Sequence, residues 1–133
     1  MNNRVVHFEI YAQDPERAMK FYTEVFGWTF PKWDFNGMPY YGVMTAPEGS
    51  TEPGINGGLL KRPGPLPTGS DAVIGYACTV QVENIDETIA KIEKAGGILA
   101  LAKMAIPGMA WQAYYKDTEG NIFGVHQADK NAK

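Results

Sequence analysis

Residues 14–27, with the sequence DPERAMKFYTEVFG, contain the start, the apolar stripe and the end of one amphipathic helix. Asp14 is suited to cap the first turn, and Pro15 fits the first helical position, with an acidic residue directly after it. Apolar residues then recur at helical spacing, at Pro15, Ala18, Met19, Tyr22, Val25 and Phe26. Gly27 is typical of a left-handed helix stop. We therefore predict one helix that ends just before Gly27.

The same pattern returns 70 positions later, where Asp14 aligns with Asn84 and Gly27 aligns with Gly97. Asn84 has an acidic residue three positions on, which is close to a capping box. The second apolar stripe consists of Ile85, Thr88, Ile89, Ile92 and Ala95. Two copies of a strand–helix–three-strand unit are the economical interpretation. The alternative is chance agreement between two ordinary amphipathic helices.

Strand-like segments surround both predicted helices. Residues 5–11 alternate, so that His7, Glu9 and Tyr11 share one face and the apolar residues share the other. Further strands are expected at residues 28–33, 40–46, 55–61, 73–82, 98–101, 110–116 and 121–127. A turn is expected at residues 117–121. Together these elements predict an α+β fold.

The sequence RPGPLPTGSD at residues 62–71 is the strongest linker signal in the chain. We therefore expect one domain over residues 1–133. It would consist of a first module at about residues 4–61 and a second at about residues 73–128.

Composition excludes several classes of protein. The 133 residues are 44% hydrophobic, which is enough for one folded core, and the net charge of -3 argues against nucleic acid as a partner. One cysteine and two histidines exclude a disulfide framework and a Cys/His-rich zinc module. No apolar stretch approaches the roughly 20 residues that cross a bilayer, and no signal-peptide pattern opens the sequence. We expect a cytoplasmic protein that does not bind membranes.

Two segments, VVHFEIYAQDPERAMKFYTEVFGW at residues 5–28 and YYKDTEGNIFGV at residues 114–125, resemble the vicinal oxygen chelate superfamily. This superfamily includes glyoxalase I, bleomycin resistance proteins and extradiol dioxygenases. GINGGLLKRPGP at residues 54–65 and KMAIPGMAW at residues 103–111 are similar to its glyoxalase-like bacterial members. The resemblance implies two βαβββ modules that form a U-shaped cleft, the glyoxalase-like fold, and a homodimer.

The resemblance also implies four metal-ligand positions. The first matches His7, and the second falls at Gly57 or Gly58. The third falls at Ala77, with Tyr76 or Cys78 as the alternatives one residue away, and the fourth falls at Gly124. Of the family's four ligands only the histidine, His7, is present, and a lone imidazole does not hold a catalytic divalent metal at useful affinity. We therefore expect no metal or other cofactor.

A divalent metal held by an atypical set of ligands is the alternative. Glu9 and His126 each lie two residues along a strand from a family position. That spacing is nearly 7 Å, whereas metal–ligand distances are near 2 Å. Such a displaced set therefore tolerates little error in position.

Five residues are candidates for a site. His7 is suited to acid–base chemistry or to hydrogen bonding a substrate, and Glu9 on the same face could be a catalytic base. Each also has a structural interpretation, His7 as a histidine satisfied by a neighbour and Glu9 as a solvated charge. Gln112 and Tyr114 are expected to line the cleft, because strand alternation places the neighbouring aromatic residues on the other face. His126, on the last strand, is a further substrate-binding candidate.

Two functions follow. The first is a glyoxalase-like protein that binds a small organic ligand in an aromatic cleft without the usual metal, as bleomycin resistance relatives sequester their ligand. The second is a superfamily enzyme, a lyase, isomerase or dioxygenase, that uses His7 with an atypical metal set or Glu9 as base.

Overall fold

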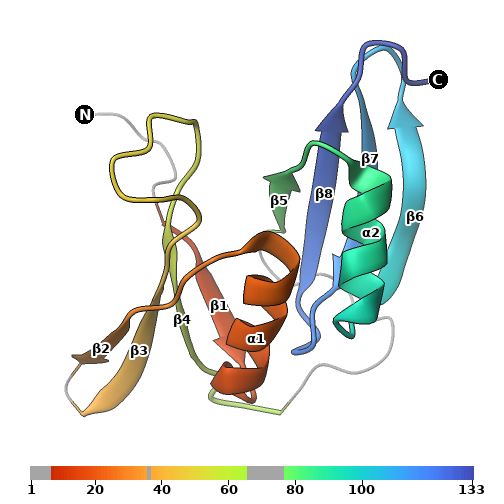
Figure 1. Ribbon diagram of the computed structural model, residues 1–133. Coiled ribbons are helices and arrows are strands. Elements are labelled where there is room, and N and C mark those ends of the chain that lie inside the picture. The colour runs from red at the N-terminus through yellow and green to blue at the C-terminus, as the bar shows by residue number, and fades with distance from the viewer. Residues whose placement is uncertain (1–6, 36, 66–76) are drawn as a thin grey trace. The chain divides into compact units, whose positions relative to one another are not determined.

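The computed structural model describes residues 7–35, 37–65 and 77–133, and the chain divides into two compact units, Met1–Leu66 and Pro67–Lys133 (Figure 1). Three predicted segments, residues 5–6, 66–71 and 73–76, lie outside the described residues. Each unit is a four-stranded mixed sheet with one helix. The prediction of an α+β fold with two βαβββ modules is therefore confirmed.

The first unit follows the order strand, helix, three strands. Its elements are β1 (Glu9–Ala12), α1 (Pro15–Phe26), β2 (Lys32–Phe35), β3 (Met38–Val43) and β4 (Gly57–Lys61). The strand order in the sheet is β1-β4-β3-β2. β1 pairs with β4 in parallel, and the other neighbours are antiparallel. The parallel pair places the first strand of the unit beside the last.

Helix α1 begins and ends as predicted. The Asp14 side chain accepts a hydrogen bond from the backbone N–H of Arg17 at 3.2 Å, and Pro15 is the first helical residue. Gly27 adopts φ 73°, a left-handed conformation that favours glycine, and its N–H bonds the carbonyl of Thr23 at 2.9 Å. These local contacts fix both ends of the helix.

The core of the first unit lies between α1 and one face of its sheet. Its fully buried members are Ala12, Ala18, Val43 and Leu59. Partly buried side chains pack around them, namely Phe8, Ile10, Met19, Trp28, Phe30 and Tyr41. Because side chains alternate along a strand, the residues between these core members face away from α1. We call that surface the helix-free face of the first sheet.

The second unit repeats this topology. Its elements are β5 (Cys78–Gln81), α2 (Ile85–Lys94), β6 (Ile98–Ile106), β7 (Ala110–Lys116) and β8 (Ile122–Ala128). The strand order is β5-β8-β7-β6, with β5 and β8 parallel. Each strand therefore takes the sheet position of its counterpart in the first unit, and the internal repeat read from the two helices is confirmed.

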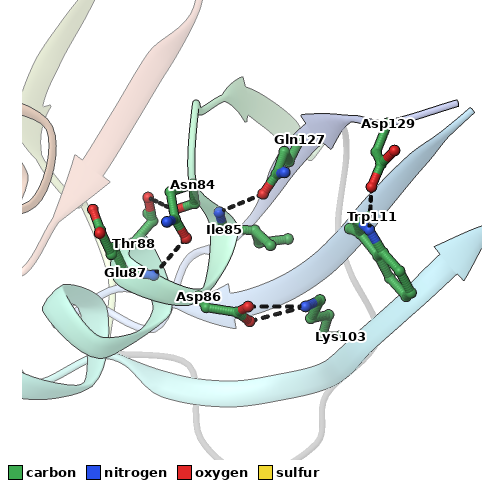
Figure 2. A network of polar contacts seen from close by, with 9 residues as sticks. All are labelled: Asn84, Ile85, Asp86, Glu87, Thr88, Lys103, Trp111, Gln127 and Asp129. Carbon is green, nitrogen blue, oxygen red and sulfur yellow. Dashed lines mark hydrogen bonds and ion pairs between the residues drawn. The ribbon is translucent and has the colours of Figure 1, made fainter. Parts of the chain in front are cut away.

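Helix α2 is held at its start by side chains (Figure 2). Asn84 Oδ1 accepts from the backbone N–H of Glu87 at 3.1 Å, and the N–H of Ile85 donates to Gln127 Oε1 on β8 at 2.8 Å. Ile85 and Ile92 are buried on the side of α2 that meets the sheet. The predicted second helix is therefore present and sits on one face only, which leaves a helix-free face on the second sheet as well.

Several predicted strand boundaries are wrong, including those of β2, β3 and β6. The strand expected at residues 28–33 begins at Lys32, because Pro31 has no N–H to donate and only an isolated bridge between Thr29 and Met44 precedes it. The strand expected at residues 98–101 continues to Ile106 through two irregularities in register. No helix in the described parts of the chain is long and apolar enough to span a membrane.

Candidate functional site

The helix-free face of the first sheet is organised around Gly58. This residue pairs with Glu9 on β1 and with Gly42 on β3. Its neighbour Leu59 is fully buried in the core beneath α1, so Gly58 faces the other way. The same alternation places Glu9 and Tyr40 on this face.

A chain of hydrogen bonds joins three side chains on this face. His7 Nε2 lies 3.0 Å from the Tyr40 hydroxyl, and that hydroxyl donates to Glu9 Oε2 at 2.9 Å. His7 Nε2 and Glu9 Oε2 are 4.0 Å apart, and a second phenol, Tyr11, donates to Glu9 Oε1 at 3.4 Å. Tyr40 therefore bridges the imidazole and the carboxylate that the sequence placed on one face.

Tyr40 keeps its proton throughout the neutral range. Burial raises the pKa of Tyr40 to about 12, with further contributions from its hydrogen bond to Glu9, the charge of Glu9 and Tyr11. Because the phenol donates to Glu9, its oxygen is free to accept from His7. The imidazole then carries a proton on Nε2. The three groups form a directed path from the imidazole to the carboxylate.

Two glycines make room for aromatic rings on the same face. A Cβ atom at Gly58 would overlap the hydroxyl end of Tyr40, and a Cβ at Gly42 would lie 2.8 Å from the Trp33 ring. Trp33 and Tyr40 stack with their centroids 6.3 Å apart and their planes 11° apart. Trp33 is nevertheless 50% exposed. The face thus offers a flat aromatic surface beside polar groups.

The helix-free face of the second sheet has a matching centre at Gly124. This residue pairs with Thr79 on β5 and with Tyr114 on β7. A Cβ at Gly124 would lie 2.7 Å from both Gln112 Nε2 and Thr79 Oγ1, and 3.1 Å from the ring of Tyr114. These three side chains therefore converge on the space that the glycine leaves.

Gln112 is bound to a histidine. His126 Nδ1 lies 2.8 Å from Gln112 Oε1, on the neighbouring strand position. An amide oxygen can only accept, so the imidazole carries its proton on Nδ1. Gln112 is 5% exposed, whereas His126 is partly exposed. The amide is therefore fixed in orientation and nearly enclosed.

The candidate residues fall into two groups, each placed within its own unit. His7 and Glu9 join through Tyr40 in the first unit, and Gln112, Tyr114 and His126 share the helix-free face of the second. The neighbours of Gln112 on β7 point to the other side, where the Trp111 indole bonds Asp129 and the Tyr115 hydroxyl bonds Glu93 of α2. The alternation expected along β7 is therefore present.

Sequence reasoning did not single out Tyr40. The signal was present in alternation, because Tyr40 and Gly42 fall on one face of β3 while Tyr41 and Val43 fall on the core face. What the sequence lacked was the register that lays Tyr40 over Gly58.

Two of the four positions that the resemblance implies cannot supply a metal ligand. Gly58 and Gly124 have no ligating atoms, and their side-chain space belongs to Tyr40 and Gln112. Within the described ranges, no three His, Cys, Asp or Glu side chains gather closely enough to hold a metal ion.

Comparison with known proteins gives a family model that matches the first part of the chain. The family model described as bleomycin resistance protein-like N-terminal matches residues 4–42. A search of curated proteins gave no match.

Solved structures match nearly the whole chain. A glyoxalase family protein from Bacillus cereus has a TM-score of 0.72 at 16% identity and covers 96% of this chain and 95% of its own. UcmS2 has a TM-score of 0.69 at 24% identity, with coverage of 95% and 98%. TnmS3, an antibiotic-binding protein from Streptomyces sp. CB03234, has a TM-score of 0.67 at 21% identity, with coverage of 96% and 98%. These likenesses show that the fold is glyoxalase-like.

Proposed function

We propose that the chain is a distant member of the glyoxalase/bleomycin resistance/dioxygenase superfamily and that it binds a small aromatic molecule without the metal of the superfamily's enzymes. The candidate binding surfaces are the helix-free face of the first sheet and, separately, the helix-free face of the second sheet. Small-molecule sites combine apolar and aromatic surface with a few oriented polar groups, and both faces have this make-up.

The observation that carries the proposal is the exposed Trp33 ring stacked on Tyr40. A half-exposed tryptophan has an unused aromatic face that a planar ligand can cover. The hydrogen-bonded Tyr40, His7 and Glu9 lie directly beside it and would orient such a ligand. TnmS3, which shares the fold, is an antibiotic-binding protein, and this supports a binding role in sequestration.

A thermal-shift screen of planar aromatic compounds tests this proposal, with intrinsic tryptophan fluorescence as the second readout. A ligand at 100-fold its dissociation constant should add about 2.7 kcal/mol to the free energy of unfolding. Trp33→Ala should remove most of this gain for compounds that use the first sheet. A matched control is Trp28→Phe, because Trp28 lies on the core side. The proposal fails if no compound in the screen stabilises the protein.

A catalytic role is the second candidate, and the hydrogen-bonded path from His7 through Tyr40 to Glu9 favours it. Such a path can move a proton between the imidazole and the carboxylate. Turnover of a bound compound, measured by product formation, would support this function if His7→Ala and Glu9→Gln each abolished it without abolishing binding. Binding with no turnover leaves the first function alone.

We also propose that the chain forms a homodimer. The supporting feature is β6, an edge strand that carries several exposed apolar side chains, Ile98, Leu99, Leu101 and Met104. Exposed apolar side chains grouped on one strand are typical of protein interfaces.

A further inference from the structure

Both units build the same arrangement at the same register position. Glu9 pairs with Gly58 in the first unit, and Thr79, 70 residues later, pairs with Gly124 in the second. Each glycine gives its side-chain space to a polar residue of the adjacent strand, Tyr40 or Gln112.

The two polar residues are equivalent in position. Tyr40 lies two residues before Gly42, the partner of Gly58, and Gln112 lies two residues before Tyr114, the partner of Gly124. Each also contacts a histidine, at 3.0 Å in the first unit and at 2.8 Å in the second. The residues of β3 and β7 at these positions are not identical. The recurrence of a polar side chain above a glycine therefore indicates a property of the fold and not of a shared local sequence.

The second unit leaves one hydrogen-bond donor unused. Gln112 Oε1 lies 2.8 Å from His126 Nδ1, so the Nε2 end of the amide is the end that points away from the imidazole. Gln112 Nε2 has no hydrogen-bond partner within the described part of the chain, and it is not sealed from solvent. Because Gln112 is only 5% exposed while its Nε2 atom is not sealed from solvent, this donor is available to a ligand that enters the helix-free face of the second sheet.

We propose that Gln112 is a specificity-determining residue whose Nε2–H group donates to a carbonyl oxygen of the bound ligand. His126 is the positioning residue, since its Nδ1–H group holds the amide oxygen and directs the amide nitrogen toward the space above Gly124. The Tyr114 ring borders the same space and provides an apolar contact. The inference rests on the proposed binding function and names its ligand class, planar molecules with a ring carbonyl.

Two small probe compounds that differ only in the ring carbonyl test this inference. 1-Indanone carries a ring carbonyl, and indane has a methylene group in its place. Titration of ¹⁵N-labelled full-length protein by NMR gives both dissociation constants and shows which residues respond. We expect 1-indanone to bind about five- to tenfold more tightly than indane, the factor that one net hydrogen bond supplies, with shifts at the Gln112 side-chain amide.

Variants separate recognition from folding. Gln112→Glu keeps an acceptor for His126 but removes the N–H donor, so the preference for 1-indanone should disappear. Gln112→Leu should have the same effect and serves as a second variant. Gln81→Leu is the matched control, because Gln81 is an exposed glutamine on β5, which β8 separates from β7, and the preference should survive there.

Several outcomes would overturn the inference. It fails if wild-type protein binds both probes equally, if neither probe shifts signals of the second sheet, or if Gln112→Glu retains the preference. Compounds from the aromatic screen that shift only first-unit signals would reject the role of Gln112 and leave the binding function standing. A screen without any binder would reject the binding function itself.

Discussion

At the scale of single residues, the absence of a side chain at Gly58 is as informative as the side chains around it. A Cβ at this position would overlap the Tyr40 hydroxyl, and an aromatic ring held by two hydrogen bonds moves aside only with loss of both. We predict that Gly58→Ala lowers the free energy of unfolding by about 1–3 kcal/mol, the usual range for overpacking. Urea denaturation measures this change.

A double-mutant cycle identifies the cause. In a Tyr40→Ala background the overlapping ring is gone, so Gly58→Ala should cost much less than it does alone. If Gly58→Ala lowers the free energy of unfolding equally in wild type and in Tyr40→Ala, the glycine is needed for a reason other than contact with the Tyr40 ring. Gly64→Ala is a control, because a Cβ there has no neighbour within 4 Å in the structure.

The sequence predicts individual faces well and cross-strand partners poorly. Alternation along one strand is a local property, so it placed His7 and Glu9 together and separated Gln112 from its aromatic neighbours. The bridge from Tyr40 to Glu9 joins residues 31 positions apart, and its existence depends on the register between β1, β4 and β3. Register is set by the whole sheet, and no local pattern contains it.

At the scale of elements, the two helix N-caps should make similar contributions to the free energy of unfolding. Asp14 and Asn84 cap α1 and α2 through the same side-chain bond to the residue three positions on. We predict that Asp14→Ala and Asn84→Ala each lower the free energy of unfolding by about 1 kcal/mol. Asp14→Ser and Asn84→Ser should restore most of the loss, because serine is also a good cap. Chemical denaturation with far-UV circular dichroism tests this, and unaltered stability in either alanine variant would contradict it.

Element boundaries were harder to predict where distant contacts decide them. The end of β6 was expected near residue 101, yet the strand continues through Lys103 (Figure 2). Lys103 Nζ lies 2.9 Å from Asp86 Oδ1 of α2 and 4.7 Å from the centroid of the Trp111 ring. Both partners belong to other elements of the unit, so residues 98–106 carry no local sign of the extension.

The exposed apolar edge of β6 gives a prediction about assembly. If this strand forms the proposed homodimer interface, Leu101→Lys should weaken the dimer, because a charged side chain on an edge strand opposes pairing. Size-exclusion chromatography with light scattering should give a dimer mass for wild-type protein and a lower mass for the variant. Lys91→Glu on α2 is the control and should leave the mass unchanged. A monomeric wild-type protein would refute the interface.

At the scale of the whole molecule, the fold could be predicted because the same strand–helix–three-strand pattern occurs twice in the sequence. Each unit pairs its first strand with its last and covers one sheet face with a helix. This arrangement leaves one helix-free face per unit, and the polar candidates lie there. The duplication also explains why glycine occurs at equivalent positions in both units, since either sheet can then admit a side chain from its neighbouring strand.

The two units also share a response to alkaline pH. Burial and a carboxylate partner raise the pKa of Tyr40 in the first unit, and of Tyr115 in the second, to about 12, where the unfolded chain has about 10. Between these values the unfolded chain has lost protons that the folded chain keeps. The free energy of unfolding must therefore fall as the pH rises from about 10 to about 12, and this contribution is complete below pH 10.

Denaturation at a series of alkaline pH values measures this slope. Tyr40→Phe and Tyr115→Phe remove the phenols one at a time, and each should make the decline with pH less steep. The lysines, which titrate in the same range, remain in every variant, so the difference from wild type isolates the two phenols. The double variant should show the shallowest decline. A slope identical to that of wild type in either single variant would mean that its phenol does not keep its proton in the folded protein, and for Tyr40 it would remove the hydrogen-bonded path to Glu9.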